Sequence, residues 1–301
     1  MTLDQLRIFL KVAEQGHVTR AAQMLNLTQS AVSASLAALE TTHDVKLFDR
    51  VGRGIALTEA GRQFIPSARA VLDQARLAGE VLNDLATEAL GSLRLQASQT
   101  VANYWLPPIL VAMHESHPRI DLTLTQGNTG SVAAAVLSGS ADMGFVEGEI
   151  TQDRLERRVV AQDELVLVMA RDHPLAGHEC VTRDDYLAYP WIIREPGSGT
   201  RSEFDAHLAE MGIDPAQLSV FLEMPSNEAI LAAIAAGPSL TMLSRRAVGG
   251  AAPDQNLRAM PVTWARRPER HFSVLTHPDR YRTRAQQALL AILDSHAGQD
   301  L

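Results

Sequence analysis

The pattern of hydrophobic positions changes along the chain from short helical repeats to alternating strands and helices. Residues 2–40 place apolar side chains three and four residues apart, which is the spacing of amphipathic helices. A further helical pattern runs from residue 59 to about residue 90. Beyond residue 91, short apolar runs alternate with helical segments, which predicts an α/β fold. The pattern therefore predicts three domains: residues 1–58, 59–90 and 91–301.

Two short helical patterns lie back to back in residues 18–40. The segment between them, which includes Asn26, leaves room only for a tight turn. Thr28 is suited to cap the second helix by accepting a hydrogen bond from a free backbone N–H, and Thr19 is suited to cap the first. These features predict a helix-turn-helix, with residues 2–15 forming a helix packed across its back.

Polar residues open the second helix of this motif, namely Gln29, Ser30 and Ser33. A recognition helix enters the major groove of DNA by its N-terminal end, where short donors and acceptors contact base edges. The pattern alone fits a helical hairpin with a solvated polar face equally well. The flanking segments decide between the two, and they favour DNA binding.

The segment that follows the helix-turn-helix has the pattern of a small β-hairpin. Two short extended pieces, residues 47–50 and 55–58, flank the turn Gly52-Arg53-Gly54. This arrangement predicts a winged helix-turn-helix. A cation on a glycine-flanked tip can reach a phosphate or a narrow minor groove, so Arg53 is the expected wing contact.

The helical pattern of residues 59–90 carries an apolar seam. Its members alternate spacings of four and three, as in a coiled coil: Phe64, Ala68, Val71, Ala75, Ala78, Leu82 and Leu85. Such a seam needs a partner, so the pattern favours a linker helix that dimerises. The alternative is a helix that packs only on its own domain.

Charge is distributed unevenly along the 301 residues, which carry a net charge of −8. Residues 1–58 hold six basic against five acidic residues, a balance of +1 that leaves −9 for the remainder. A near-neutral DNA-binding domain attached to an acidic body fits a protein that touches DNA with one domain only. Cys180 is the only cysteine, which excludes an internal disulfide and a thiolate metal cluster within one chain.

Targeting signals are absent from the pattern. Lys11, Glu14 and Arg20 interrupt the first apolar stretch, which is unlike a signal peptide. The sequence also holds no apolar run long enough to span a bilayer. We therefore expect a cytoplasmic protein that makes no membrane contact.

The α/β region reads as two lobes. Strand-like and helical runs continue to about residue 160, a second set occupies residues 161–266, and residues 267–301 return to complete the first lobe. Two α/β lobes joined by crossing segments make a hinged domain of the periplasmic-binding-protein kind.

Small polar residues gather at four predicted strand-to-helix turns. In an open α/β sheet, ligands bind beyond the carboxyl ends of the strands, and helix N-termini there favour anions. The turns are Ser98-Gln99-Thr100, Asn128-Thr129-Gly130-Ser131, Gly197-Ser198-Gly199-Thr200-Arg201 and Ser226-Asn227. Helix capping explains any one turn alone, whereas four turns converging on one cleft favour a ligand site.

The third turn indicates the chemistry of the ligand. Arg201 can pair bidentately with a carboxylate, a phosphate or an oxyanion of sulfur, and the glycines let the backbone approach closely. Glu147 ends a predicted strand and would repel an anion unless it pairs with Arg201 or receives a proton or donor from the ligand. It fits a structural role between the lobes equally well.

Two other functional classes compete with a ligand-controlled DNA-binding protein. The sequence contains no nucleophile elbow, phosphate loop or zinc-protease motif, which argues against an enzyme acting on a small anion. A ligand-independent architectural DNA-binding protein is the other alternative, but it would not need a polar cleft domain. No metal or cofactor is expected.

The segments LTQSAVSASLAALE and LFDRVGRGIALTEAG, followed by a linker helix and a two-lobed α/β domain, closely resemble the LysR-type transcriptional regulators. The resemblance covers essentially the whole chain. It implies DNA contacts by Gln29, Ser30, Ser33 and Arg53, although this chain has Ala34 where many members carry a long basic or amide side chain. VANYWLPPIL, GFVEG and REPGSGTR resemble the subgroup that regulates sulfur assimilation, in part in response to sulfite, and carbon-fixation operons.

The resemblance also implies partners and a mechanism. It implies a homotetramer, built as a dimer of dimers, that bends promoter DNA, works with RNA polymerase and changes the bend when a small anionic co-inducer binds. The candidate DNA-binding residues are Thr19, Thr28, Gln29, Ser30, Ser33 and Arg53. The candidate effector-binding residues are Ser98, Gln99, Thr100, Asn128, Thr129, Glu147, Ser198, Gly199, Thr200, Arg201 and Asn227.

Overall fold

The computed structural model divides the chain into two compact units, one over residues 1–85 and one over most of residues 86–301. The structure describes residues 1–52, 54–84, 91–148, 150, 154–249 and 256–300. Within these residues, no helix is both long and apolar enough to cross a membrane.

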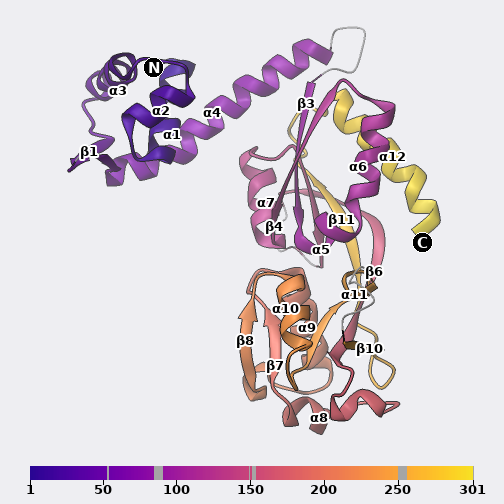
Figure 1. The fold of residues 1–301 in the computed structure, drawn as a ribbon. Coiled ribbons are helices and arrows are strands. Elements are labelled where there is room, and N and C mark those ends of the chain that lie inside the picture. Colours follow the sequence, from indigo (N-terminus) through magenta and orange to yellow (C-terminus); the bar gives the residue numbers. More distant parts are fainter. Residues whose placement is uncertain (53, 85–90, 149, 151–153, 250–255, 301) are drawn as a thin grey trace. The chain divides into compact units, whose positions relative to one another are not determined.

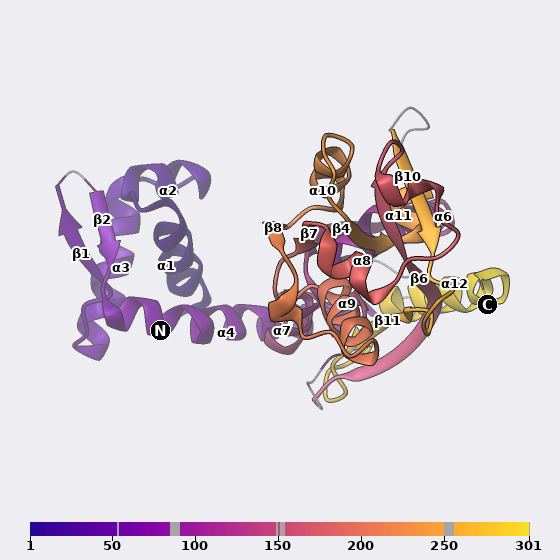
Figure 2. The same cartoon turned by 90° about the horizontal axis from the view of Figure 1, so that it is seen from below.

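The first unit is a winged helix-turn-helix followed by one long helix (Figure 1). Its elements are α1 (Leu3–Gln15), α2 (Val18–Met24), α3 (Gln29–His43), β1 (Phe48–Val51), β2 (Gly54–Leu57) and α4 (Glu59–Asp84). The strands β1 and β2 pair antiparallel, from Phe48 opposite Leu57 to Val51 opposite Gly54. Figure 2 shows this hairpin at the edge of the unit, beside α3.

Local capping chemistry sets most helix ends of the first unit. Thr2 and Gln5 form a capping box at α1, which ends at Gly16 in the left-handed conformation (φ 59°). Thr28 caps α3 as predicted, accepting from Ala31 N at 3.2 Å. The predicted cap at Thr19 is wrong, because α2 already begins at Val18 and Thr19 lies inside it.

Aromatic packing joins the long helix to the winged domain. Phe9 is fully buried and its ring lies 5.5 Å from that of Phe48 on the wing and 5.1 Å from that of Phe64 on α4. Burying one such side chain contributes about 1.5–3 kcal/mol. Ala68 is also buried in this core. The start of the predicted seam therefore packs on its own domain, as the alternative interpretation expected.

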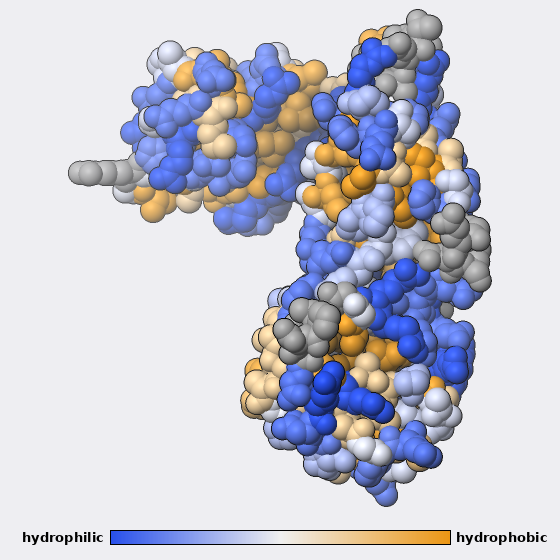
Figure 3. Space-filling model, turned by 45° about the vertical axis from the view of Figure 1, so that its right-hand side comes forward, coloured by the Kyte–Doolittle hydropathy of each residue, from blue (hydrophilic) through white to orange (hydrophobic). Residues whose placement is uncertain are grey.

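Further along α4 the seam turns to the surface. Val71 is 40% exposed and Leu82 is 69% exposed within the chain. Leu85, the last predicted seam residue, lies outside the described residues. The space-filling view shows hydrophobic residues at the surface of both units among hydrophilic ones (Figure 3).

The second unit consists of two α/β lobes. Lobe 1 contains β3 (Gly91–Ser98), α5 (Gln99–Tyr104), α6 (Leu106–Ser116), β4 (Ile120–Gly127), α7 (Thr129–Ser138), β5 (Met143–Glu147) and the C-terminal α12 (Arg284–Asp300). Lobe 2 contains η1 (Pro174–Gly177), α8 (Arg183–Ala188), β7 (Trp191–Arg194), α9 (Gly199–Glu210), η2 (Pro215–Gln217), β8 (Val220–Met224), α10 (Asn227–Ile234), β9 (Thr241–Ser244), α11 (Arg245–Gly249) and β10 (Leu257–Pro261).

Two long antiparallel strands connect the lobes, namely β6 (Glu156–Ala170) and β11 (Glu269–Thr276). Figure 1 shows both running between the lobes. The main sheet has the order β10-β6-β11-β5-β3-β4, and β9 also pairs with β6. Among the named strands of the described residues, β3 pairs parallel with β4 and β5, and β7 pairs parallel with β8, whereas the other strand pairs are antiparallel, so the main sheet is mixed.

Each lobe has a core on both sides of its sheet. In lobe 2, Leu165 and Leu167 of β6 face the core under α8 and α9, while Val166 and Val168 face the core under α10. This is why residues 165–170 form an uninterrupted apolar run, since a strand covered on both faces has no solvent side.

One predicted helix is broken in the structure. Residues 100–117 read as one helical run, but α5 ends at Tyr104 and α6 begins at Leu106. Pro107 and Pro108 lack the N–H that a continuous helix requires and are tolerated only in a first turn. The break leaves α5 as a short separate helix at the edge of lobe 1 that faces lobe 2.

Candidate functional site

The N-terminal end of α3 presents the predicted polar residues at the surface. Thr28, Gln29 and Ser30 are exposed and Ser33 is half-buried, whereas Val32 on the same helix is buried in the core. Thr28 Oγ1 and Ser30 Oγ lie 3.1 Å apart. The apolar face of α3 thus fixes the helix and leaves its polar leading edge accessible, which suits entry into a major groove.

Of the two other predicted DNA contacts, one is exposed and one lies outside the described residues. Thr19 is exposed on α2. Arg53, at the tip of the wing, lies outside the described residues. Ala34 is exposed on α3, so this position offers only a methyl group to a partner.

A buried carboxylate attaches the wing to the recognition helix. Glu40 of α3 accepts hydrogen bonds from Leu47 N at 2.7 Å and Phe48 N at 3.2 Å, and Lys46 Nζ lies 3.0 Å from it. Burial alone would raise the pKa of Glu40, but these donors together hold it below its ordinary value of 4.5. The wing is therefore held by charge-assisted bonds as well as by apolar packing.

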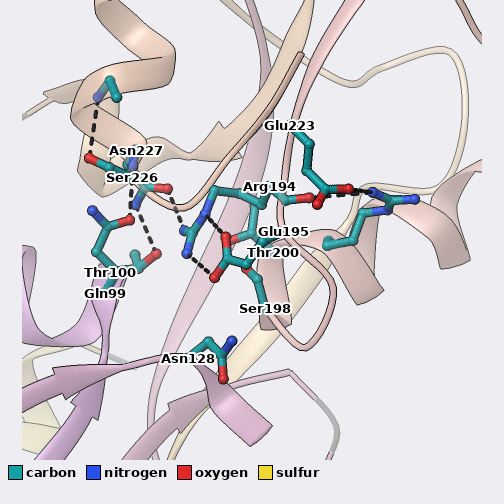
Figure 4. A network of polar contacts seen from close by, with 12 residues as sticks. Gln99, Thr100, Asn128, Arg194, Glu195, Ser198, Thr200, Glu223, Ser226 and Asn227 are labelled. Atoms are coloured by element: carbon teal, nitrogen blue, oxygen red, sulfur yellow. Dashed lines mark hydrogen bonds and ion pairs between the residues drawn. The ribbon is translucent and has the colours of Figure 1, made fainter. Parts of the chain in front are cut away.

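The four predicted turns of the second unit meet between the lobes. Asn227, at the start of α10, donates from its backbone N to Gln99 Oε1 at 2.8 Å and from Nδ2 to Thr100 Oγ1 at 3.2 Å (Figure 4). Arg194 Nη1 donates to Asn227 Oδ1 at 2.7 Å. The first and fourth turns are thus joined directly, and Arg194 lies buried beside them, where it also pairs with Glu195 at 2.8 Å.

The second and third turns also touch each other. Gly130 N donates to Gly197 O at 3.3 Å. A Cβ built on Gly199 would lie 2.2 Å from Glu147 O, so this glycine permits the close approach. Asn128 lies across from Ser198 in Figure 4. Ser198 Oγ is buried and has no hydrogen-bond partner within the described residues.

A charged network lies beneath these turns. Arg270 of β11 donates to Thr200 Oγ1 at 3.0 Å, pairs with Asp163 at 2.8 Å and lies 3.8 Å from Glu147. Ser98 Oγ donates to Glu147, and Thr129 Oγ1 donates to Glu147 O at 3.0 Å.

The Glu147 carboxyl group is buried, and this raises its pKa more than Arg270 and Arg194 lower it. Among the described residues, Glu147 faces Arg270 rather than Arg201, the partner that the sequence offered as one possibility.

Arg201 lies away from lobe 1. Its Nε donates to both carboxylate oxygens of Asp205, at 2.9 and 3.0 Å, and its Nη1 donates to Arg194 O at 3.3 Å. Glu223 lies 3.6 Å from the same guanidinium. Asp205 is one turn further along α9, where an i,i+4 partner is the nearest carboxylate. The predicted cation of the third turn is therefore already neutralised in this arrangement.

One further carboxylate bridges the lobes at the edge of this site. Glu228 of α10 accepts from Gln99 Nε2 at 2.6 Å, Asn103 Nδ2 at 2.9 Å and Tyr104 OH at 2.6 Å, all in lobe 1. Burial would raise the pKa of Glu228, but its donors, Ser226 among them, lower it below the ordinary value. The donors of α5 are thus satisfied by a carboxylate of the chain itself.

Sequence analysis missed three of these residues: Arg194, Glu228 and Arg270. Arg194 ends an apolar run and Arg270 begins one. A charge beside a buried strand could have indicated a polar site, because a buried charge requires partners. Glu228 gave no local signal, since its partners are more than 120 residues away in the chain.

Comparison with known families matches the chain almost from end to end. The model described as "Bacterial regulatory helix-turn-helix protein, lysR family" matches residues 3–62. The model described as "LysR substrate binding domain" matches residues 86–298. Both parts of the predicted fold are therefore confirmed.

Similar curated proteins are named as regulators. A transcriptional regulator of Escherichia coli, YeiE, is 38% identical over 252 residues, covering 82% of each chain. A protein of Synechocystis named "Probable RuBisCO transcriptional regulator" is 32% identical over 292 residues, covering 96% of this chain and 84% of its own. These names support the predicted resemblance to carbon-fixation regulators, whereas the resemblance to sulfur-assimilation regulators stays a prediction.

Solved structures agree on the fold. Full-length CbnR, determined with its target DNA, superposes with a TM-score of 0.75 at 22% identity over the whole of both chains. The regulatory domain of Synechocystis CcmR, determined in complex with 2-PG, superposes with a TM-score of 0.63 at 26% identity, covering 69% of this chain and 97% of that domain. The chain belongs to the LysR family of transcriptional regulators, DNA-binding proteins with a ligand-binding domain, and it is not an enzyme.

Proposed function

We propose that a small anion bound between the two lobes controls how this regulator binds and bends its promoter. The observation that carries the proposal is Ser198 Oγ, a buried hydroxyl without a hydrogen-bond partner in the described part of the chain, at the meeting point of four polar turns. Buried polar groups are normally bonded. A ligand oxygen between the lobes would supply the missing bond.

The ligand classes follow from the groups that converge there. Hydroxyls, amides and a buried arginine suit a sulfite or other sulfur oxyanion, a phosphorylated metabolite or a carboxylate. The relative CcmR is named as binding 2-PG through its corresponding domain. The proposed contacts are Ser98, Gln99, Thr100, Asn128, Thr129, Glu147, Ser198, Gly199, Thr200, Arg201 and Asn227, with Arg194 added from the structure.

A thermal-shift screen tests the proposal directly. Sulfite, sulfate, phosphorylated sugars and small carboxylates are added to the full chain, and a ligand that binds the folded state raises the melting temperature in proportion to ln(1 + [L]/Kd). Ser198→Ala should abolish the shift. Ser219→Ala, an exposed serine of the same lobe, is the matched control and should keep it.

Footprinting on the upstream promoter completes the test. We expect the ligand found in the screen to change the footprint, Arg194→Ala to abolish the change, and both variants to keep DNA binding. Arg201→Ala should have the smaller effect, because its guanidinium must first leave Asp205. A footprint that no anion changes would instead favour an architectural DNA-binding protein.

The assembly belongs to the same proposal. We infer a homotetramer, a dimer of dimers held through the linker helix and the ligand-binding domains, acting with RNA polymerase on promoter DNA. The exposed seam residues Val71 and Leu82 support the helix contact. Functional boundaries are placed at residues 58 and 90, with lobe 1 at about 91–160 and 267–301 and lobe 2 at about 161–266.

A further inference from the structure

A cavity of about 690 Å³ is lined by residues that lie outside the four turns. Side chains of α9, of the lobe 1 part of β6 and of the start of β11 line it, among them Arg157, Val159, Ala206, His207, Arg267 and His271. We name it the α9 cavity. Its lining differs from that of the proposed effector site, which Ser98, Asn128 and Asn227 form.

The α9 cavity is lined by a buried imidazole, one nitrogen of which has no hydrogen-bond partner in the described part of the chain. His207 is 2% exposed, and its Nε2 lies 3.0 Å from Tyr186 OH. Burial lowers the pKa of His207 more than the nearby Glu210 raises it, so the ring is neutral at pH 7. A neutral imidazole that accepts from Tyr186 at Nε2 carries its proton on Nδ1. That Nδ1 has no hydrogen-bond partner within the residues that the structure describes.

Arg270 also lines the cavity. Its Nη2 is buried and lies 2.8 Å from Asp163 Oδ2 in an ion pair, so its charge is already compensated. Buried polar groups without partners are uncommon in native proteins. The unpartnered Nδ1 of His207 therefore indicates a missing hydrogen-bond partner in the cavity.

The charges around the α9 cavity favour an anion. Among the described residues, Arg157 donates only to neutral groups, Ser273 Oγ at 3.0 Å and Gly148 O at 3.1 Å. Arg267 and His271 form no ion pair with any residue that the structure describes. The lining holds four arginines against three glutamates, and one of these glutamates, Glu210, is already paired with Arg266 at 2.9 Å.

We propose that the α9 cavity is a second anion-binding site, which takes phosphate or a small phosphate monoester. Guanidinium groups hold phosphate oxygens by charge-assisted hydrogen bonds. His207 Nδ1 would donate to the same group. Val159, which is 49% exposed, and Ala206 offer apolar surface to the carbon part of a monoester.

The site would be coupled to the cleft through Arg270. This side chain lines the α9 cavity and also donates to Thr200 in the third turn, beside Glu147. A phosphate that attracts Arg270 therefore alters the contacts beneath the effector site. By linkage, each anion would change the affinity of the other by the same factor.

Isothermal titration of the full chain with inorganic phosphate and with glycerol 3-phosphate tests this inference. We expect at least one of the two to bind, and the double variant Arg157→Ala/Arg267→Ala to weaken that binding at least tenfold, about one unit of log Kd. Arg258→Ala is the matched control, since it removes an exposed arginine outside the cavity. It should leave binding unchanged.

The outcomes separate this site from the proposed effector site. Phosphate binding that survives Ser198→Ala and falls in the double variant supports the α9 cavity. If Ser198→Ala abolishes binding, the anion binds between the turns and the inference is wrong. The inference is also wrong if neither probe binds. Because Arg157 and Arg267 are exposed, the double variant should fold. His271→Ala, a single exposed change, gives an independent reduction if it does not.

Discussion

At the scale of single residues, the contact between Gly199 and Glu147 decides how closely the lobes approach. We predict that Gly199→Ala forces them apart, because its Cβ would lie 2.2 Å from Glu147 O and that atom is backbone. Overpacking of this kind costs about 1–3 kcal/mol. Thermal unfolding of the variant should therefore occur at lower temperature, and the effector-induced shift should be lost.

The control for this change is Gly177→Ala. A Cβ at Gly177 would meet nothing within 4 Å, and its backbone does not require glycine. It should unfold at the wild-type temperature and keep the ligand response. Equal behaviour of the two variants would show that the contact between Gly199 and Glu147 does not limit closure.

At the scale of elements, Glu40 joins α3 to the wing, and its pKa makes that junction sensitive to pH. The carboxylate has a lower pKa in the folded protein than in the unfolded chain, so it stabilises the fold above about pH 4.5. This contribution is lost as the pH falls through the lower, folded value. Glu40→Gln should reduce the melting temperature of the first unit by about 5 °C at pH 7.

Circular dichroism of the full chain, recorded during heating at several values between pH 3 and pH 7, measures this change in the melting temperature of the first unit. The difference between wild type and Glu40→Gln should shrink toward low pH, where the wild-type carboxyl is itself protonated. Glu14→Gln is the control, because Glu14 is exposed and bonds only Lys11. If the difference in melting temperature between the two proteins were the same at every pH, Glu40 would stabilise the junction by the shape of its side chain and not by its charge.

Elements governed by local chemistry could be predicted from the sequence, and those governed by distant partners could not. The helices of the first unit follow from apolar spacing and from the caps at Thr2 and Thr28. The long strand β6 was only half predicted, since Arg157 and Asp163 interrupt its apolar pattern. Asp163 is buried there because Arg270, more than 100 residues away, compensates its charge.

The candidate site shows the same division. Strand ends and glycines indicated that the four turns would converge, which follows from the topology of an α/β sheet. Both arginines are paired with a carboxylate, Arg201 with Asp205 and Arg194 with Glu195, but packing lets only Arg194 reach Asn227 as well. Spacing along the chain carries no information about that choice.

At the scale of the whole molecule, we expect the exposed part of the α4 seam to hold the assembly together. Leu82→Asp places a charge on the most exposed large apolar residue of those that the structure describes. If Leu82 is covered by a partner, burying that charge is unfavourable and the tetramer should dissociate. Size-exclusion chromatography with light scattering would then show a lower mass.

The matched control for assembly is Val51→Asp, since Val51 is 60% exposed on β1, outside both proposed contacts. This variant should keep the wild-type mass. Identical masses for all three proteins, wild type included, would remove α4 from the interface and leave the ligand-binding domains as the only contact proposed.

The hydrogen bonds that Glu228 makes across the lobes set a minimum effector concentration for the response. A carboxylate tethered beside Gln99, Asn103 and Tyr104 competes with any free anion that needs the same donors, at an effective concentration in the millimolar range. A free anion that uses the same donors must therefore displace the Glu228 carboxylate before it can bind. The regulator would then respond only when the effector has accumulated to a concentration that displaces Glu228, and not to trace amounts of the effector.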